Sequence, residues 1–255
     1  MNFMGLEETS SGQAMKDQDA PERSKFYFEM IAHKMKNILQ TVLSATDLCN
    51  NYLNGNQNLD EIQQLINMIT QQTYKGSTFI SNIQKLFLID EITSPIEAVN
   101  VSEMLNKTIN NLKLHFKTKL LKIQIISSVK HPLVLANEFL EDVFENLLLN
   151  AVVHNSNSVI EVIIKISRMP KDETNYLQLE FIDNGKGIPD DRKPFLFQRQ
   201  STKSPDGGGM GLGLSIVQHL VSLYNGTIHV EDKVPGDYSQ GSNFIILIPE
   251  APESC

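Results

Sequence analysis

The most constraining feature of this 255-residue sequence is a glycine-rich stretch between residues 183 and 214. Its second half has five glycines within the seven residues from Gly207 to Gly213, directly before an apolar run. Glycine inside a helix or strand costs about 0.5–1 kcal/mol relative to alanine, so this segment is poorly suited to a packed core. It suits a backbone that approaches a polyanion closely, with a helix starting near Gly211. A flexible linker fits less well, because such linkers are rich in Ser, Thr and Pro.

The spacing of these glycines excludes the two common nucleotide-binding loops. The sequence has no G-x-x-x-x-G-K-[ST] motif, and the five glycines do not form G-x-G-x-x-G. Three other boxes are complete: N-L-L-L-N-A at 146–151, D-x-G-x-G at 183–187 and G-x-G-L-G-L at 209–214. In this order and spacing they resemble the boxes of the gyrase, histidine kinase and MutL ATPase superfamily. The resemblance implies an ATP-binding domain.

This resemblance assigns a role to each residue that matches a box. Asn150 corresponds to the asparagine whose side-chain oxygen holds Mg²⁺ between the phosphates, and Asn146 lies one turn earlier on the same helix face. Asp183 corresponds to the aspartate that accepts a hydrogen bond from the adenine amino group, although an aspartate before Asn-Gly is also an ordinary turn residue. The other expected nucleotide contacts are Gly185, Gly187, Phe197, Lys203, Gly209, Gly211, Leu212 and Gly213. Lys203 is equally well explained as a solvated loop lysine.

Two apolar stripes before residue 93 predict a helical hairpin. Apolar residues recur at steps of three and four from Phe28 to Leu48, and again from Ile62 to Phe87. A turn-rich cluster at residues 54–58 separates them. A hairpin this thin buries little by itself, so we expect two copies to form a four-helix bundle in a homodimer. The alternative is a hairpin that lies on the C-terminal domain.

His33 is the expected phosphoacceptor. A lone histidine on a helix is usually a surface residue, but residues 33–40, H-K-M-K-N-I-L-Q, resemble the H-box of histidine kinases in its H-R-x-K-N-x-L-Q variety. The commoner H-box has an acid directly after the histidine, where this chain has Lys34. The resemblance adds Lys36 and Asn37 to the catalytic set. In relatives the position of Asn37 orients water that hydrolyses phospho-aspartate on a partner, which implies a phosphatase activity.

Composition narrows the class of protein. The formal net charge of −8 argues against nucleic acid as a main partner. No run of 18 apolar residues is present to span a membrane, and the N-terminus lacks the apolar region of a signal peptide. Two cysteines indicate no disulfide framework. We therefore expect a cytoplasmic protein.

The chain is expected to have three segments and an α+β fold. Residues 1–20 are polar and predict a disordered leader, and residues 21–92 form the hairpin for dimerisation and histidine phosphotransfer. Pro95 ends the second helix, so residues 96–250 form the ATP-binding domain. Strands and helices interleave there without regular βαβ alternation, which favours an α/β sandwich with helices on one face of a mixed sheet.

Two polar residues are expected to cap helices in this C-terminal domain. Ser102 precedes an apolar-periodic segment that ends near Phe116, with Glu103 in the first turn. Asn137 precedes a second such segment, which runs through His154. We therefore expect a helix from Met104 to Phe116 capped by Ser102, and a longer one through His154 capped by Asn137.

Taken together, the motifs predict a two-component histidine kinase that uses ATP and Mg²⁺. His33 is phosphorylated, and the phosphoryl group then passes to an aspartate of a response-regulator receiver domain. One alternative is a phosphatase or pseudokinase that binds ATP without transferring it. An ATP-driven clamp like gyrase and MutL is disfavoured because Asn146 replaces the glutamate that activates water in those branches. A protein-serine kinase of the branched-chain dehydrogenase kinase type shares the ATP boxes but would not need an H-box.

Overall fold

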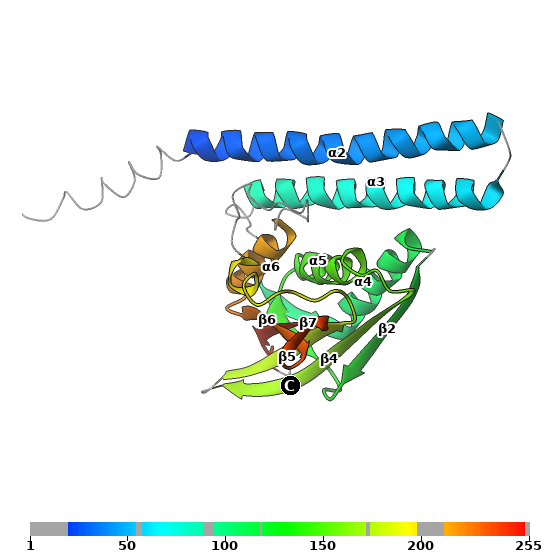
Figure 1. The fold of residues 1–255 in the computed structure, drawn as a ribbon. Helices are drawn as coiled ribbons and strands as arrows, with labels where there is room; N and C mark the ends of the chain where they lie inside the picture. Colours follow the sequence, from blue (N-terminus) through cyan, green and yellow to red (C-terminus); the bar gives the residue numbers. More distant parts are fainter. Residues whose placement is uncertain are drawn as a thin grey trace, which may run out of the picture. The chain divides into compact units, whose positions relative to one another are not determined.

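The two apolar stripes form two long helices, α2 (Ala20–Asn54) and α3 (Leu59–Leu88), which confirms the predicted hairpin (Figure 1). Asp60 and Glu61 lie in the first turn of α3, where the helix dipole favours negative charge. The Asn58 side chain accepts a hydrogen bond from the Glu61 N–H at 3.4 Å. The turn-rich cluster therefore ends one helix and helps to begin the next.

The structure is a computed structural model that describes residues 20–54, 58–88, 94–117, 119–171, 174–197 and 212–252. The predicted leader up to residue 19 lies outside these ranges. The chain divides into two compact units, residues 1–76 and residues 77–255, so α3 begins in the first unit and ends in the second. Within the described ranges, every helix is too short or too polar to cross a bilayer.

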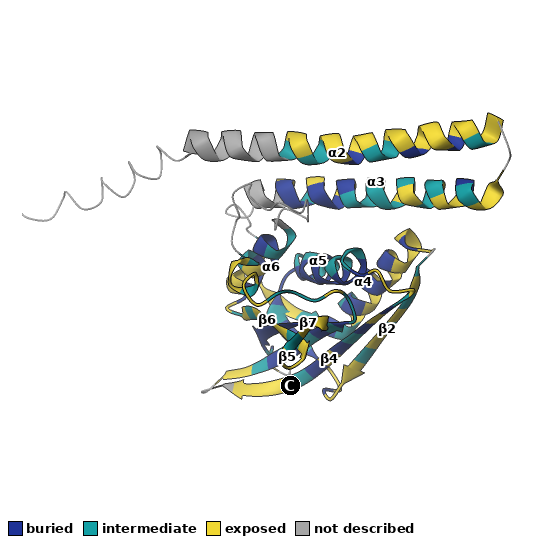
Figure 2. Cartoon of the chain, viewed as in Figure 1, coloured by how far each residue is buried: buried dark blue, intermediate teal, exposed yellow. Residues whose placement is uncertain are grey.

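The hairpin of the first unit has a narrow buried seam, and many residues along both helices are exposed (Figure 2). Ile38, Ala45 and Cys49 are buried on α2 at spacings of seven and four residues, as in helix pairs that pack along one stripe. Gly76 of α3 faces this seam, because a Cβ there would lie 3.4 Å from Ile38 Cγ2. Several large apolar side chains stay exposed in the single chain: Leu39, Leu43, Leu53, Leu59, Ile66 and Met68.

The second unit is built on a mixed five-stranded sheet with strand order β2-β4-β5-β7-β6. Its strands are β2 (Leu120–Ser127), β4 (Val159–Lys171), β5 (Thr174–Asp183), β6 (Thr227–Val234) and β7 (Asp237–Pro249). Strands β2 and β4 run parallel, and the other neighbours run antiparallel. A separate antiparallel pair joins β1 (Glu97–Asn100) and β3 (Leu133–Ala136).

Three helices cover one face of this sheet: α4 (Val101–His115), α5 (Leu140–Val153) and α6 (Leu212–Leu223) (Figure 1). Alternate residues of β5 from Leu177 onward point to the covered face and are buried, and the ring of Phe181 lies 5.8 Å from that of Phe144 on α5. The same alternation places Asp183, the last residue of β5, among the buried residues. The predicted α/β sandwich with a mixed sheet is confirmed.

Both predicted helix caps are wrong in detail. The N-cap of α4 is Asn100, whose side chain accepts hydrogen bonds from the N–H groups of Ser102 and Glu103 at 3.0 and 3.2 Å. Ser102 therefore lies inside the helix. The reason is that β1 ends at Asn100, which becomes the N-cap two residues before the expected one. α5 begins at Leu140 with Phe139 at its N-cap, three residues after Asn137.

Asn137 instead anchors the end of α6. The Tyr224 hydroxyl donates to Asn137 Oδ1 at 2.6 Å, and that oxygen also accepts from the Phe139 N–H at 3.2 Å. Tyr224 is only 2% exposed, and burial raises the pKa of its phenol above the ordinary value of 10.0. This bond ties the helix after the glycine-rich stretch to the helix with the asparagine box.

We expect Tyr224→Phe to lower the free energy of unfolding by about 1 kcal/mol, the net contribution of one buried hydrogen bond. Urea unfolding at pH 7 measures this loss, and Tyr238→Phe, at an exposed tyrosine, is the control. The pKa of the Tyr224 phenol is higher in the folded state than in the unfolded state. Its contribution to the free energy of unfolding is therefore complete below pH 10.0 and falls as pH rises above that value. Wild type should lose more stability than Tyr224→Phe between pH 10 and 11. Parallel losses in both proteins would contradict the assignment.

Candidate functional site

Asp183 ends β5 as a buried carboxylate that is 6% exposed. Its Oδ1 accepts a hydrogen bond from the Gly185 N–H at 2.6 Å, and its Oδ2 accepts one from the Ser242 hydroxyl. A carboxylate out of water requires such donors, and two of them fix its orientation. Ser242 was missed by the sequence analysis because it belongs to no local motif. The register that pairs Ile182 with Asn243 brings it beside Asp183.

The backbone around this carboxylate is packed too closely for side chains. Gly187 has φ of 64°, and a Cβ there would lie 1.6 Å from the Tyr238 carbonyl oxygen. Gly241 has φ of 122°, and its Cβ would lie 2.2 Å from the Asp183 carbonyl oxygen. Both positions therefore require glycine. Gly185 and Gly187 are thus brought to Asp183 as expected, and Gly241 is a further glycine that the motif did not include.

The side chain of Asn184 connects three segments behind Asp183. Its Oδ1 accepts from Asn155 Nδ2 at 2.7 Å and from the Glu161 N–H at 2.9 Å. Its Nδ2 donates to the Val159 carbonyl oxygen at 3.0 Å. The Asn157 side chain donates to the Asn184 carbonyl oxygen. The loop after β5 is therefore held to the start of β4 and to the segment that leaves α5.

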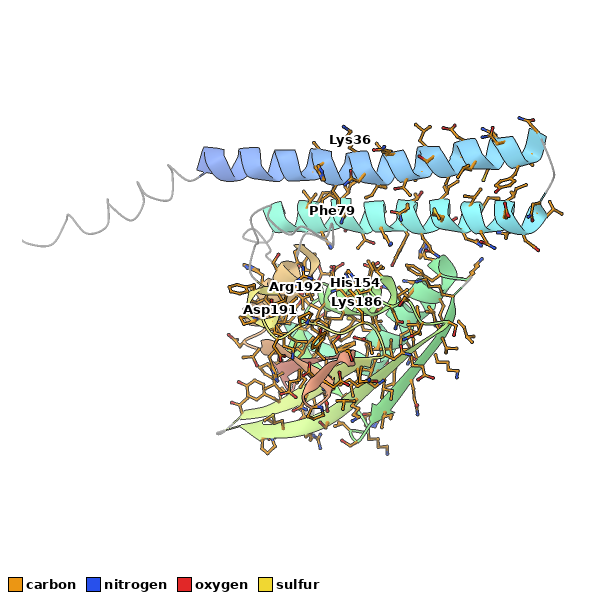
Figure 3. The ribbon with its side chains drawn as sticks, in the orientation of Figure 1. Lys36, Phe79, His154, Lys186, Asp191 and Arg192 are labelled. Carbon is orange, nitrogen blue, oxygen red and sulfur yellow. The ribbon has the colours of Figure 1, made fainter. Side chains whose placement is uncertain are left out.

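The two asparagines of the α5 box lie in different environments. Asn146 is 4% exposed, and its Nδ2 donates to the Asp142 carbonyl oxygen at 2.8 Å. Asn150, one turn later, is half-buried, and within the described residues its carboxamide has no hydrogen-bond partner. The Lys186 N–H lies 3.4 Å from the His154 carbonyl oxygen, so the loop after Asp183 meets the end of α5 (Figure 3). Asn150 and Asp183 thus belong to one region of the second unit.

The donor set is compatible with a magnesium ion that is held mainly by phosphates. Among the described residues, no group of three His, Cys, Asp or Glu side chains is arranged to hold a metal ion. Mg²⁺ keeps several waters and takes few protein oxygens when phosphates supply the rest. The oxygen of the half-buried Asn150 fits this requirement, and Asp183 is already engaged by two donors.

The loop that follows the second glycine box contacts the sheet through Lys193 and Phe197. Lys193 in the short helix η2 (Lys193–Phe195) pairs with Asp190 and lies 2.6 Å from Asp232 of β6. The hydrogen bonds to these two carboxylates raise the pKa of Lys193. Phe197 packs edge-on against Phe244, with ring centroids 6.4 Å apart. Phe197 is therefore attached to the sheet next to the Ser242 segment.

Part of the predicted site lies outside the described residues. These positions are Lys203, Gly209 and Gly211, together with the side chain of Leu212 at the start of α6. Gly213, one residue further, lies against α5, because a Cβ there would be 2.5 Å from Asn146 Oδ1. The structure therefore brings the end of the third box to the first.

The predicted phosphoacceptor lies on an exposed part of α2 in the first unit. His33, Lys36 and Asn37 are all exposed, and Lys36 is labelled in Figure 3. Asn37 Nδ2 lies 3.5 Å from His33 Nδ1, one helical turn away. Lys34 is partly buried, and burial lowers the pKa of its amine. The H-box thus presents its histidine to solvent beside a carboxamide.

Comparisons with known proteins agree with this arrangement. Residues 136–252 match the family described as histidine kinase-, DNA gyrase B-, and HSP90-like ATPase. The chain is 28% identical over 181 residues to the sensor histidine kinase YvrG of Bacillus subtilis, covering 68% of this chain and 30% of YvrG. It is 24% identical over 250 residues to the autoinducer 2 sensor kinase/phosphatase LuxQ of Vibrio vulnificus, covering 94% of this chain and 28% of LuxQ. The chain thus spans less than a third of each relative.

A solved structure shares the fold across both units. The crystal structure of histidine kinase ThkA in complex with the response regulator protein TrrA matches with a TM-score of 0.57 and 18% identity, over 95% of this chain and 67% of that chain. At this identity the likeness concerns the fold alone. Residues 136–252, which contain the three boxes, thus match an ATPase domain of the histidine kinase-, DNA gyrase B-, and HSP90-like kind, and the chain is similar to sensor histidine kinases over a longer stretch.

Proposed function

We propose that this chain is an ATP-dependent protein histidine kinase that phosphorylates itself on His33. One observation carries the proposal: an exposed H-box histidine and an ATPase-family domain occur in the same chain. The phosphoryl group would then pass to an aspartate of a response-regulator receiver. That step is supported by the relatives, of which ThkA was crystallised with the response regulator TrrA.

Asp183 would recognise the adenine base. Its carboxylate is oriented by the Gly185 N–H and the Ser242 hydroxyl, so an oxygen lone pair is available in a fixed direction for the adenine amino group. Guanine presents a carbonyl oxygen at the equivalent position and would repel the carboxylate. The expected selectivity for adenine therefore depends on Asp183 being ionised and immobile.

The phosphates would lie between α5 and the start of α6. Asn150 would hold Mg²⁺, which when bound neutralises phosphate charge. Asn146 and Gly213 would line the same place, and Phe197 would support the loop beside it. Lys203, Gly209, Gly211 and Leu212 complete the proposed set from the motifs. Asn146 replaces the water-activating glutamate of the gyrase branch, which favours transfer to a protein group over hydrolysis.

His33 would act as the nucleophile in its neutral form. The Asn37 carboxamide lies beside Nδ1, and with its oxygen turned toward the ring it would accept the Nδ1–H. The lone pair then resides on Nε2, which attacks the γ-phosphorus while the bond to the ADP oxygen breaks. Exposed Lys36 would supply positive charge near the incoming phosphate. Asn37 would also serve a phosphatase activity by orienting water toward a partner's phospho-aspartate.

The exposed apolar side chains of the hairpin favour a homodimer. Leu39 and Leu43 are 61% and 63% exposed, one turn apart on α2. Burial of such side chains contributes about 1.5–3 kcal/mol each. A second hairpin of the same sequence would cover them in a four-helix bundle.

His33→Gln should abolish phosphorylation if His33 is the acceptor. Incubation with γ-³²P-ATP and Mg²⁺ measures the acid-labile, base-stable label expected of phosphohistidine. His131→Gln, at an exposed histidine outside the H-box, should keep the wild-type label. Equal label in wild type and His33→Gln would rule out the assignment, and nucleotide binding without any label would favour the pseudokinase alternative.

Asp183→Asn should weaken ATP binding by roughly tenfold or more, because a hydrogen bond to a charged group contributes about 1.5–3 kcal/mol. The substitution also replaces one of the two acceptor oxygens with an NH2 group, which faces either the Gly185 N–H or the Ser242 hydroxyl. Titration calorimetry with Mg-ATP and Mg-GTP measures both affinity and base selectivity. Ser156→Ala, at an exposed neighbour, is the control. Unchanged ATP affinity in a folded Asp183→Asn protein would remove Asp183 from the site.

Leu39→Ser/Leu43→Ser should shift the protein from dimer to monomer. The apolar area lost from each copy predicts a dissociation constant raised at least tenfold. Sedimentation velocity over a concentration series measures the shift, with Gln40→Ser as a control on the same exposed turn. A wild-type protein that stays monomeric at micromolar concentration would refute the dimer.

A further inference from the structure

Asn82 and Asn146 form a buried pair of carboxamides within the second unit. Asn82 lies on the C-terminal part of α3, and Asn146 lies on α5; they are 6% and 4% exposed. Asn82 Nδ2 donates to Asn146 Oδ1 at 2.8 Å, and the return contact from Asn146 Nδ2 to Asn82 Oδ1 measures 3.5 Å. No motif in the sequence pointed to Asn82.

This pair closes off the Asn146 carboxamide. Its Nδ2 is directed to the Asp142 carbonyl oxygen, and its Oδ1 to Asn82. The second lone pair of Oδ1 has little room, because even a Cβ at Gly213 would lie 2.5 Å from this oxygen. Groups from three helices thus enclose one amide. Asn146 cannot present its oxygen to a further ligand without giving up Asn82.

The proposed function requires Asn146 near the phosphates of the nucleotide. We propose that Asn82 and bound nucleotide compete for Asn146, so that nucleotide binding releases the C-terminal part of α3 from α5. Asn82 is therefore a positioning residue that acts on the nucleotide site through Asn146. The inference rests on the proposed nucleotide site, but it assigns to α3 a role that the nucleotide motifs do not contain.

The competition has a predictable sign. Separation of Asn82 from Asn146 breaks the hydrogen bond between these two buried side chains, and the free energy lost opposes nucleotide binding. The net contribution of a neutral hydrogen bond corresponds to about a two- to tenfold change in an equilibrium constant. Because linkage is reciprocal, nucleotide weakens the contact of Asn82 with α5 by the same factor.

Asn82→Ala should therefore bind the magnesium complex of a non-hydrolysable ATP analogue about two- to tenfold more tightly than wild type. Titration calorimetry measures the dissociation constant. Gln84→Ala, which removes an exposed carboxamide two residues away on α3, should leave it unchanged. In an Asn146→Ala background the effect of Asn82→Ala should vanish, because the group that it competes for is absent. A residue that merely packs would not give this dependence.

A second readout does not depend on the variants. In wild type, saturating nucleotide should speed hydrogen exchange of the backbone amides at residues 78–84, because the contact of Asn82 with Asn146 on α5 is lost. Unchanged or slower exchange there would overturn the proposal, as would unchanged or weaker nucleotide binding by folded Asn82→Ala. If wild type itself binds no nucleotide, the proposed function fails and this inference fails with it. If wild type binds nucleotide and Asn82→Ala binds it with the same affinity, this inference fails while the proposed function stands.

Discussion

The architecture of the second unit depends on how one buried carboxylate is stabilised. Leu177, Leu179 and Phe181 are alternate residues of β5 that face the helices, and Asp183 is the next in this row. A charged side chain therefore occupies a buried position where the preceding ones are apolar. An isolated buried charge costs several kcal/mol, more than one hydrogen bond returns. The hydroxyl of Ser242 and the N–H of Gly185 together offset this cost. The Gly185 donor is local, but the Ser242 donor depends on the β5–β7 register, so the proposed base recognition depends in part on the sheet pairing.

Around this carboxylate and the asparagine box, neutral amides connect several segments of the second unit. Asn184 joins the loop after β5 to β4, Asn137 joins α5 to α6, and Asn82 joins α3 to α5. A carboxamide can both donate and accept, so it connects segments without bringing a charge into the interior. Asn137 does so with its oxygen alone, which accepts from both Tyr224 and Phe139. A phosphoryl-transfer site needs orientation more than reactive side chains, because the transferred group carries the charge and the enzyme supplies the geometry. These amides satisfy that need.

Much of the fold could be predicted from the sequence because its signals are local. The hairpin stripes lie within short windows, and the structure has helices at those places. The box at 183–187 is also a short local pattern, and it lies at the end of β5. Long-range partners could not be predicted. Ser242 reaches Asp183 across 59 residues and Asn82 reaches Asn146 across 64, and no local pattern encodes either contact. The helix caps failed for a related reason: Asn100 and Ser102 are both good capping residues, and the end of β1 decides between them.

The close approach of backbone at Gly187 and Gly241 has a consequence for the unfolded chain. Glycine gives the unfolded state more conformational freedom than any other residue, so each one that must be fixed at positive φ costs folding entropy. The most tightly closed part of the site is therefore also the part whose ordering is least favourable. The contacts that hold it, from Asn184 on one side and the Lys193–Asp232 ion pair on the other, come from β4 and β6. The loop after β5 should consequently be among the last parts of the domain to order, after both flanking strands have joined the sheet.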